Sequence, residues 1–148
     1  MPVQQVSVFL DNKPGALSEL FDYLDRFRIR IFALSIADAG EFGLIRMITE
    51  DAGRATKILE DANFNLAKSK NNVEVTVILT TEEDKICRIV KILGDSGLNI
   101  EYAYSSAVHI DGKFALVLRA DDLEKAERIM EEKGVAILSL DQIKTCFE

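Results

Sequence analysis

Residues 3–24 read VQQVSVFLDNKPGALSELFDYL, and residues 73–93 read VEVTVILTTEEDKICRIVKIL. Each stretch begins with eight residues rich in β-branched side chains, which predicts a half-buried strand. Apolar residues then recur at the i, i+3, i+4 and i+7 spacing of one helix face. They are Leu17, Leu20, Phe21 and Leu24 in the first stretch, and Ile86, Ile89, Val90 and Leu93 in the second. The chain therefore contains the same strand–helix opening twice, about 70 residues apart.

The residues after each opening continue in parallel. Two extended segments, a second helix and a short final strand follow in each copy: 31–36, 42–48, 55–59 and 64–67, then 100–105, 114–120, 126–130 and 135–138. The order βαββαβ, present twice, predicts an α+β fold of two ferredoxin-like units. Each unit is expected to be an antiparallel sheet with two helices on one face, because right-handed crossovers put both helices on the same side.

The two copies predict two domains, residues 1–71 and 72–148, joined at Asn71-Asn72. A unit this small buries little more than half of its unfolded surface, and the joint is short, so we expect the domains to be docked. The strand at 31–36 has no properly polar face, so the helix-free face of its sheet is expected to be covered by the other copy or a second chain. We therefore predict a homo-oligomer, with a homodimer as the simplest form.

Composition excludes several classes of function. The chain of 148 residues has a formal charge of −7, and a phosphate-binding surface needs clustered Lys and Arg, so we expect no nucleic-acid partner. No apolar run reaches the roughly 18 residues of a membrane span, and no signal peptide is recognisable, so we expect no membrane partner and a cytoplasmic location. With two cysteines and one histidine, a disulfide scaffold or a metal site is not expected. No GxGxxG or Walker-type loop is present, and we predict no cofactor.

No group of residues predicts catalysis. Cys87 follows Ile86 on the second amphipathic helix and is expected to behave as a small buried apolar residue. His109 lies at the end of a strand beside Asp111-Gly112, where we expect an exposed, structural role. The acidic pairs at helix starts complement the helix dipole. We therefore predict that the protein is not an enzyme.

The loop Asp11-Asn12-Lys13-Pro14-Gly15-Ala16-Leu17 is the candidate binding site. Pro14 suits a first helical turn, and Asp11 or Asn12 can cap it. Gly15 inside that turn suggests that a ligand approaches the backbone closely, and free N–H groups at a helix start suit a carboxylate. Asp11 could take an ammonium group, so the loop predicts a free amino acid as ligand. A simple tight turn between strand and helix explains the same residues equally well.

The equivalent loop of the second copy differs. Thr80-Thr81-Glu82-Glu83-Asp84 resembles a capping box, with three carboxylates in the first turn that would repel a ligand carboxylate. We therefore expect one ligand-competent loop per chain, with the second copy as its wall or scaffold.

These features together resemble the ACT domain family, small regulatory modules that bind amino acids. A strand followed by Asp-Asn-Lys-Pro-Gly-Ala-Leu at a helix start is similar to the family's Pro-Gly-x-Leu pattern, here Pro14, Gly15 and Leu17. The second copy lacks Pro-Gly, which puts a site of its own in doubt, but it keeps Gly97-Leu98-Asn99-Ile100, similar to the family's entry into the second strand. The first copy has Arg28-Ile29-Arg30-Ile31 at that place.

The resemblance implies pairing of two domains through their second strands, as one eight-stranded sheet within the chain. The loop 11–17 would then face strand 99–105, which adds Asn99, Tyr102 and Tyr104 to the candidate ligand-binding residues. Asn99 can donate and accept hydrogen bonds, and each tyrosine combines apolar area with a hydroxyl. The tyrosines could equally be ordinary packing of the sheet face, and Lys13 either pairs with a ligand carboxylate or is solvated.

Three functions follow from this reading. The first is a non-catalytic amino-acid sensor with the ligand between two ACT domains. The second is a regulatory subunit that binds and controls a separate enzyme of amino-acid metabolism, as the small subunit of acetolactate synthase does. The third is a small enzyme similar to acylphosphatases, which need an Arg in the first loop, where this chain has none.

Overall fold

The computed structural model describes residues 3–67, 73–81, 85–110 and 112–146. The chain divides into two compact units. We call Gln4–Val73 the N-terminal unit, and Glu74–Glu148 with Met1–Val3 the C-terminal unit. The predicted joint Asn71-Asn72 and the acidic run Glu82-Glu83-Asp84 lie outside the described residues, as does Asp111.

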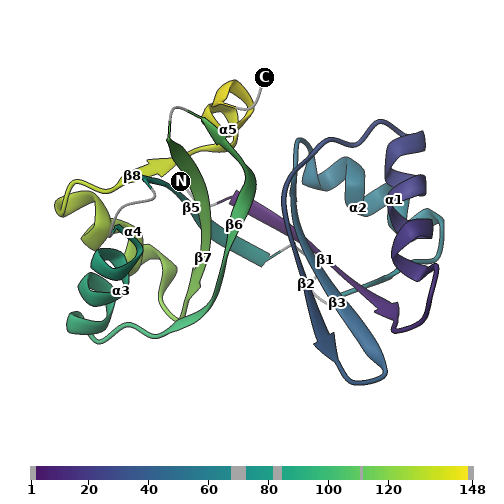
Figure 1. Cartoon of the computed structure of the whole chain (residues 1–148), viewed down its shortest axis with the longest axis horizontal. Helices are drawn as coiled ribbons and strands as arrows, with labels where there is room; N and C mark the ends of the chain where they lie inside the picture. The colour runs from purple at the N-terminus through teal and green to yellow at the C-terminus, as the bar shows by residue number, and fades with distance from the viewer. Residues whose placement is uncertain (1–2, 68–72, 82–84, 111, 147–148) are drawn as a thin grey trace. The chain divides into compact units, whose positions relative to one another are not determined.

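The N-terminal unit is a four-stranded antiparallel sheet with two helices on one face (Figure 1). Its elements are β1 (Val3–Asp11), α1 (Ala16–Arg26), β2 (Ile31–Ala39), β3 (Phe42–Thr49), α2 (Ala52–Asp61) and β4 (Asn65–Leu66). The strands lie in the order β2-β3-β1-β4. Val6 and Val8 of β1 pack against Leu20 and Leu24 of α1 and Leu59 of α2, so the core lies between the sheet and its helices.

The C-terminal unit repeats this arrangement. Its elements are β5 (Val73–Thr81), α3 (Lys85–Asp95), β6 (Ile100–Ile110), β7 (Lys113–Ala120), α4 (Leu123–Glu132), β8 (Ala136–Leu138) and α5 (Leu140–Cys146). The strands lie in the order β6-β7-β5-β8, all antiparallel. Ile78, Leu93, Leu118 and Met130 are central to its core. The α+β class with two ferredoxin-like βαββαβ units is therefore confirmed.

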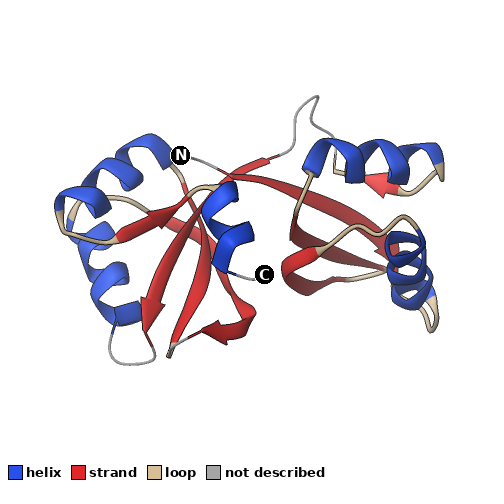
Figure 2. Cartoon of the chain, turned by 90° about the horizontal axis from the view of Figure 1, so that it is seen from above, coloured by secondary structure: helices blue, strands red, loops and turns tan. Residues whose placement is uncertain are grey.

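The final helix α5 was not predicted. It follows β8 after a single residue and lies on the side of the C-terminal unit's sheet opposite α3 and α4 (Figure 2). Ser139 and Gln142 form two reciprocal hydrogen bonds at the start of the helix. The Ser139 hydroxyl accepts from the Gln142 N–H at 3.2 Å, and the Gln142 amide oxygen accepts from the Ser139 N–H at 2.8 Å. This is a capping box, and Ile143 anchors the helix with 1% of its surface exposed.

The predicted apolar stripe of α1 is confirmed, but that of α3 is wrong in part. Leu20 and Leu24 of α1 are buried, and Leu17 and Phe21 pack beside them. On α3, Ile89 and Leu93 are buried, whereas Ile86 and Val90 are 44% and 50% exposed. The apolar face of α3 is wider than the area that the sheet covers, so its flank stays in solvent. Cys87, expected to be buried beside Ile86, is a free and exposed cysteine.

A β-bulge interrupts the alternation of faces along β2. The register shifts between Ile31 and Ala33, so Ile31, Leu34 and Ile36 all pair with core-facing residues of β3. Regular alternation would place Ile31 on the opposite face from Leu34, but the inserted residue reverses the alternation. Leu34 and Ile36 are nevertheless 39% and 53% exposed. Strand β2 is an edge of its sheet, and the helices do not extend over it.

All four long helices end in the same backbone motif. After α1, the Ile29 N–H donates to Leu24 O at 2.9 Å. The equivalent bonds after α2, α3 and α4 run from Phe64 to Leu59, from Leu98 to Leu93 and from Val135 to Met130. This closure needs a left-handed residue at the second position after the helix. The C-terminal unit uses glycine there, Gly97 and Gly134, whereas the N-terminal unit uses Arg28 at φ 55° and Asn63 at φ 64°.

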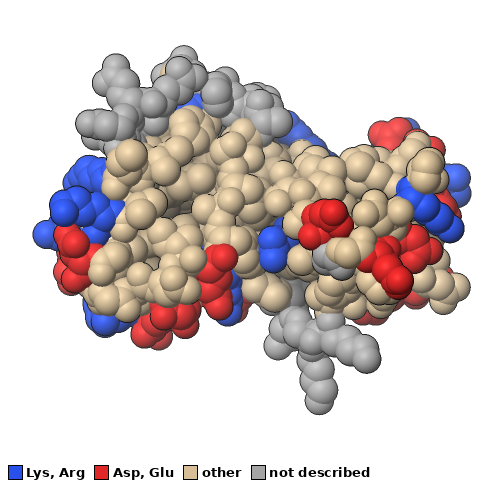
Figure 3. Space-filling model, turned by 60° about the horizontal axis from the view of Figure 1, so that its bottom comes forward, with Lys and Arg blue, Asp and Glu red and all other residues tan. Residues whose placement is uncertain are grey.

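No helix in the described parts of the chain is long and apolar enough to cross a membrane. On the face drawn in Figure 3, Lys and Arg side chains lie among Asp and Glu rather than in one continuous basic patch.

Candidate functional site

The loop between β1 and α1 begins its helix differently from the sequence prediction. Gly15 is the N-cap residue, at φ 88° and ψ −16°, and α1 begins at Ala16, so Pro14 lies outside the helix. No side chain of the described residues caps α1, which corrects the prediction for Asp11 and Asn12. A Cβ built on Gly15 would meet no atom within 4 Å. The left-handed backbone therefore requires glycine here, and no neighbouring atom of the chain does.

Asn12 ties this loop to the turn between β2 and β3. Its backbone N–H donates to Glu41 O at 3.0 Å, and its side-chain amide donates to Gly40 O at 3.3 Å. The same amide reaches the Asp38 carboxylate at 3.4 Å, which also accepts from the Gly40 N–H at 3.0 Å. Asn12 thus holds the loop in place instead of capping the helix.

A hollow of about 260 Å³ lies beside the loop, within the N-terminal unit. Asp11, Lys13, Ala16 and Glu19 line it from the loop and the first turn of α1. Aromatic side chains from three other segments complete its walls: Phe9 on β1, Phe42 at the start of β3 and Phe64 before β4. The lining of the hollow therefore combines charged groups with aromatic residues.

Asp11 and Lys13 carry opposite charges at this hollow. The Lys13 ammonium lies 3.6 Å from the Asp11 carboxylate, and both side chains are largely exposed. A pair this exposed contributes little to stability, because water screens it and the side chains lose entropy. The two groups can therefore separate to meet a ligand that carries both charges. The N–H groups of the first turn of α1 have no side-chain cap and supply a positive dipole at the same end.

Three predicted loop residues, Asp11, Lys13 and Ala16, thus line the hollow together. Asn12 bonds to the hairpin turn, Leu17 packs against the core, and Pro14 and Gly15 are exposed. Glu19 and the phenylalanines were not singled out from the sequence. Glu19 falls one helical turn after Gly15, a spacing that could have suggested it, but no local pattern brings Phe42 or Phe64 to the loop.

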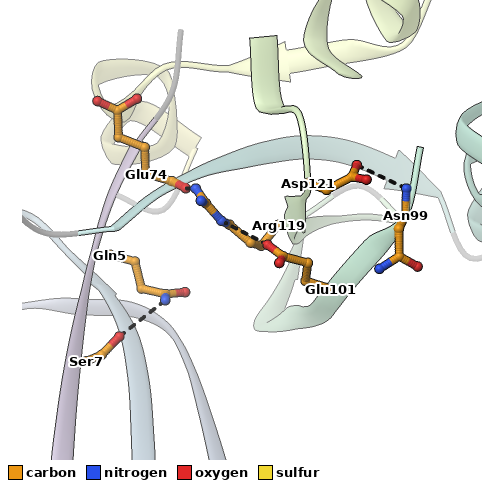
Figure 4. A network of polar contacts seen from close by, with 7 residues as sticks. All are labelled: Gln5, Ser7, Glu74, Asn99, Glu101, Arg119 and Asp121. Carbon is orange, nitrogen blue, oxygen red and sulfur yellow. Dashed lines mark hydrogen bonds and ion pairs between the residues drawn. The ribbon is translucent and has the colours of Figure 1, made fainter. Parts of the chain in front are cut away.

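The other predicted residues belong to the C-terminal unit. Tyr102 and Tyr104 lie on one face of β6 with ring centroids 6.5 Å apart and an angle of 17° between the rings. They pair with Arg119 and Val117 of β7, on the face away from α3 and α4. Asn99 immediately precedes β6, and its backbone N–H donates to the Asp121 carboxylate at 3.1 Å (Figure 4). Its side chain is exposed.

Arg119 is a charged neighbour of the tyrosines that the sequence did not suggest. Its guanidinium donates to the Glu101 carboxylate at 3.3 Å and to the Glu74 carbonyl oxygen at 2.6 Å (Figure 4). These contacts hold the cation over the sheet face that carries Tyr102 and Tyr104. Two hydroxyls and a fixed guanidinium on one face suit a polar or anionic ligand group.

No cluster of three or more His, Cys, Asp or Glu that could hold a metal occurs in the described part of the chain. Cys87 is exposed on α3, and the side chain of His109 lies outside the description.

Comparison with known proteins identifies the family. The model of the ACT domain pair matches residues 1–145. The chain belongs to this family. ACT domain pairs are regulatory ligand-binding modules, and the match covers both units, as the resemblance from the first loop predicted.

Solved structures agree with the ACT fold. Protein BT0572 from Bacteroides thetaiotaomicron is 30% identical, with 97% of this chain and 96% of that chain covered and a TM-score of 0.86. The regulatory subunit of aspartate kinase from Thermus thermophilus, in a ligand-free form, is 14% identical (88% and 92% covered, TM-score 0.58). The regulatory subunit of aspartate kinase from Thermus flavus is 15% identical, with 99% of this chain and 94% of that chain covered and a TM-score of 0.54. The last two share the fold only. No curated protein sequence matches the chain significantly.

Proposed function

We propose that this ACT domain pair is a non-catalytic sensor of a free amino acid, with its ligand at the loop 11–17. The observation that carries the proposal is the oppositely charged pair Asp11 and Lys13 at the rim of the 260 Å³ hollow. The ligand ammonium pairs with Asp11, and the ligand carboxylate takes Lys13 and the uncapped N–H groups of α1. The side chain of the ligand occupies the apolar part of the hollow.

The resemblance adds a second wall to this proposal. In ACT pairs the second strand of a partner domain holds the other side of the ligand, and we assign Asn99, Tyr102 and Tyr104 of β6 to that role. A ligand that contacts two domains binds the closed arrangement better than the open one, and only that difference shifts the equilibrium. The sensor works in the cytoplasm as a homodimer.

Calorimetric titration with each of the twenty amino acids tests the proposal. We expect one of them to bind, and Asp11→Asn and Lys13→Gln each to weaken it about tenfold, the value of a charge-assisted hydrogen bond. Lys91 and Asp95 form a matched control, an exposed pair also 3.6 Å apart but on α3. Lys91→Gln and Asp95→Asn should leave the affinity unchanged.

A substitution at Gly15 would be a less specific test of the site. Any side chain there is strained by the φ of 88°, so Gly15→Leu lowers stability as well as binding. The substitutions at Asp11 and Lys13 therefore give the clearer measurement of binding. A folded chain that binds none of the twenty, or binding that survives both Asp11→Asn and Lys13→Gln, would refute the site.

A second function is favoured by the edge of the N-terminal sheet. Leu34 and Ile36 are exposed on β2, which is an edge strand among the described residues, and such a surface suits addition of a partner strand. We therefore propose, as the alternative, a regulatory subunit that holds a separate enzyme, the role named for the aspartate kinase subunits of similar fold. Stoichiometric co-purification of an enzyme, lost in Ile36→Lys, supports it. Recovery of the chain alone at native expression levels counts against it.

A further inference from the structure

The hollow beside the loop 11–17 carries a charge that the proposed function does not use. Asp11 and Lys13 are assigned to the ammonium and the carboxylate that all amino acids share, which leaves Glu19 as a third charged residue of the lining. Glu19 is exposed, and its carboxylate forms no ion pair or hydrogen bond with the described residues. Lys13 is the one cation among the described lining residues, and it already lies against Asp11. The lining therefore has one carboxylate more than the common groups of an amino acid need.

Glu19 lies one helical turn beyond the part of the hollow that would hold these common groups. Its backbone N–H donates to Gly15 O at 3.0 Å, and the helix rises about 6 Å over these four residues. Ala16 lines the hollow between them, where its short side chain leaves room along the helix. The four-carbon stem of a lysine side chain spans a comparable distance. A ligand held at the loop can therefore reach Glu19 with the end of a long side chain.

Aromatic rings lie beside Glu19. Tyr23 follows Glu19 by four residues, so the two side chains are neighbours on one flank of α1. The centroid of the Tyr23 ring lies 5.7 Å from that of Phe64, with the rings tilted by 56°. Phe64 is half-buried and lines the hollow together with Glu19. A carboxylate next to aromatic rings attracts a cation both by its charge and through the ring faces, whereas it repels an acidic side chain.

The residues that carry this argument all lie in the continuous described range 3–67. The last of them along the chain is Asn65, which pairs with Phe9 of β1. The chain then runs back along β1, because the Ala67 N–H donates to Ser7 O at 3.0 Å, and so it leads away from the end of β1 that borders the hollow.

We infer that the ligand of this hollow is an amino acid with a cationic side chain, lysine or arginine. The inference rests on the proposed function, because Asp11 and Lys13 still hold the common ammonium and carboxylate. The methylene stem of the ligand lies along Ala16, and its side-chain cation pairs with Glu19 beside Phe64. An ammonium and a guanidinium both donate N–H groups, so the same carboxylate accepts either.

Calorimetric titrations of the full-length protein with lysine and with norleucine, which is lysine without its side-chain ammonium, test the inference. We expect lysine to bind about fivefold more tightly than norleucine, the upper value for an ion pair that water reaches. Arginine should bind as lysine does, and glutamate should bind more weakly than norleucine. In Glu19→Gln the preference for lysine over norleucine should disappear, while the affinity for norleucine stays the same.

Glu124→Gln is the matched control. Glu124 is also an exposed carboxylate in the first turn of a helix, α4, where it complements the helix dipole, but it does not line this hollow. This variant should keep the full preference for lysine.

Norleucine that binds as tightly as lysine overturns the inference, as does a preference for lysine that persists in Glu19→Gln. If neither lysine nor arginine binds and another amino acid does, with an affinity that depends on Asp11 and Lys13, the inference fails and the proposed function stands. A folded chain that binds no amino acid refutes both.

Discussion

Replacement of Arg28 by glycine is expected to stabilise the N-terminal unit. Arg28 follows the end of α1 at φ 55°, a conformation that residues with a Cβ avoid. Its N–H donates to Asp25 O at 2.9 Å, and the next N–H, of Ile29, closes the helix on Leu24. The equivalent residue after α3 is Gly97, at φ 76°, with the same two hydrogen bonds. The chain therefore holds both versions of one motif.

The size of the effect follows from two opposing terms. The left-handed backbone costs a residue with a side chain about 1–2 kcal/mol. Glycine loses about 0.5–1 kcal/mol more conformational entropy on folding than alanine. The Arg28 side chain is exposed, so its removal loses little buried surface. Arg28→Gly should therefore raise the free energy of unfolding by about 0.5–1 kcal/mol.

The reverse substitution gives an internal check of the same size. A Cβ at Gly97 would meet no atom within 4 Å, so Gly97→Ala adds backbone strain without a clash. It should lower the free energy of unfolding by about 0.5–1 kcal/mol. Arg28→Ala removes the arginine side chain but keeps the strain, and it should change stability little.

Urea unfolding followed by circular dichroism measures these changes at an unaltered m-value. Hydrogen exchange read by mass spectrometry assigns each change to one unit, since the strain is local to α1 or α3. If Arg28→Gly is no more stable than Arg28→Ala, the left-handed backbone is not the cost that we assign to it. A neutral Gly97→Ala would lead to the same conclusion.

Three further predictions concern buried or capping groups. The Thr49 hydroxyl is buried and has no hydrogen-bond partner among the described residues, so Thr49→Val should raise the urea midpoint by the equivalent of about 1 kcal/mol; a lower midpoint would mean that the hydroxyl is satisfied. The Thr76 hydroxyl donates at 2.5 Å to the buried Glu127 carboxylate, so Thr76→Val should cost about 1–3 kcal/mol in the same assay, and no loss would show that water replaces the donor. Asp122 caps α4 by accepting from the Lys125 N–H at 3.1 Å, so Asp122→Ala should lower thermal stability by about 1 kcal/mol, whereas Asp122→Asn, which also caps, should restore most of it.

The sequence predicted the repeat and the order of elements because both depend on local periodicity. Strand alternation and helical spacing are properties of short segments, and each survives in the structure with its ends moved by a few residues. The edge strand β2 was harder, since one bulge at Phe32 reverses which side chains face the core. The exposure of Ile86 and Val90 depends on how far the sheet extends under α3, which no single segment encodes.

The candidate site could likewise be predicted only where it depends on local sequence. The loop 11–17 stood out because Pro and Gly restrict the backbone locally, and three of its residues do line a hollow. Gly15 was expected to leave room for a ligand, and its positive φ is a second reason for glycine that only coordinates reveal. Asn12 looked like a helix cap, yet its best partners lie in a turn that tertiary folding brings to it.

The bonds of Asn12 have a mechanical consequence. They join the β1–α1 loop to the tip of the β2–β3 hairpin, so the loop cannot shift by itself without breaking its hydrogen bonds to Glu41 and Gly40. A displacement of the loop therefore also displaces the hairpin and its edge strand β2, on which Leu34 and Ile36 are exposed. A change at the loop can therefore reach the edge of the sheet without a rearrangement of the hydrophobic core.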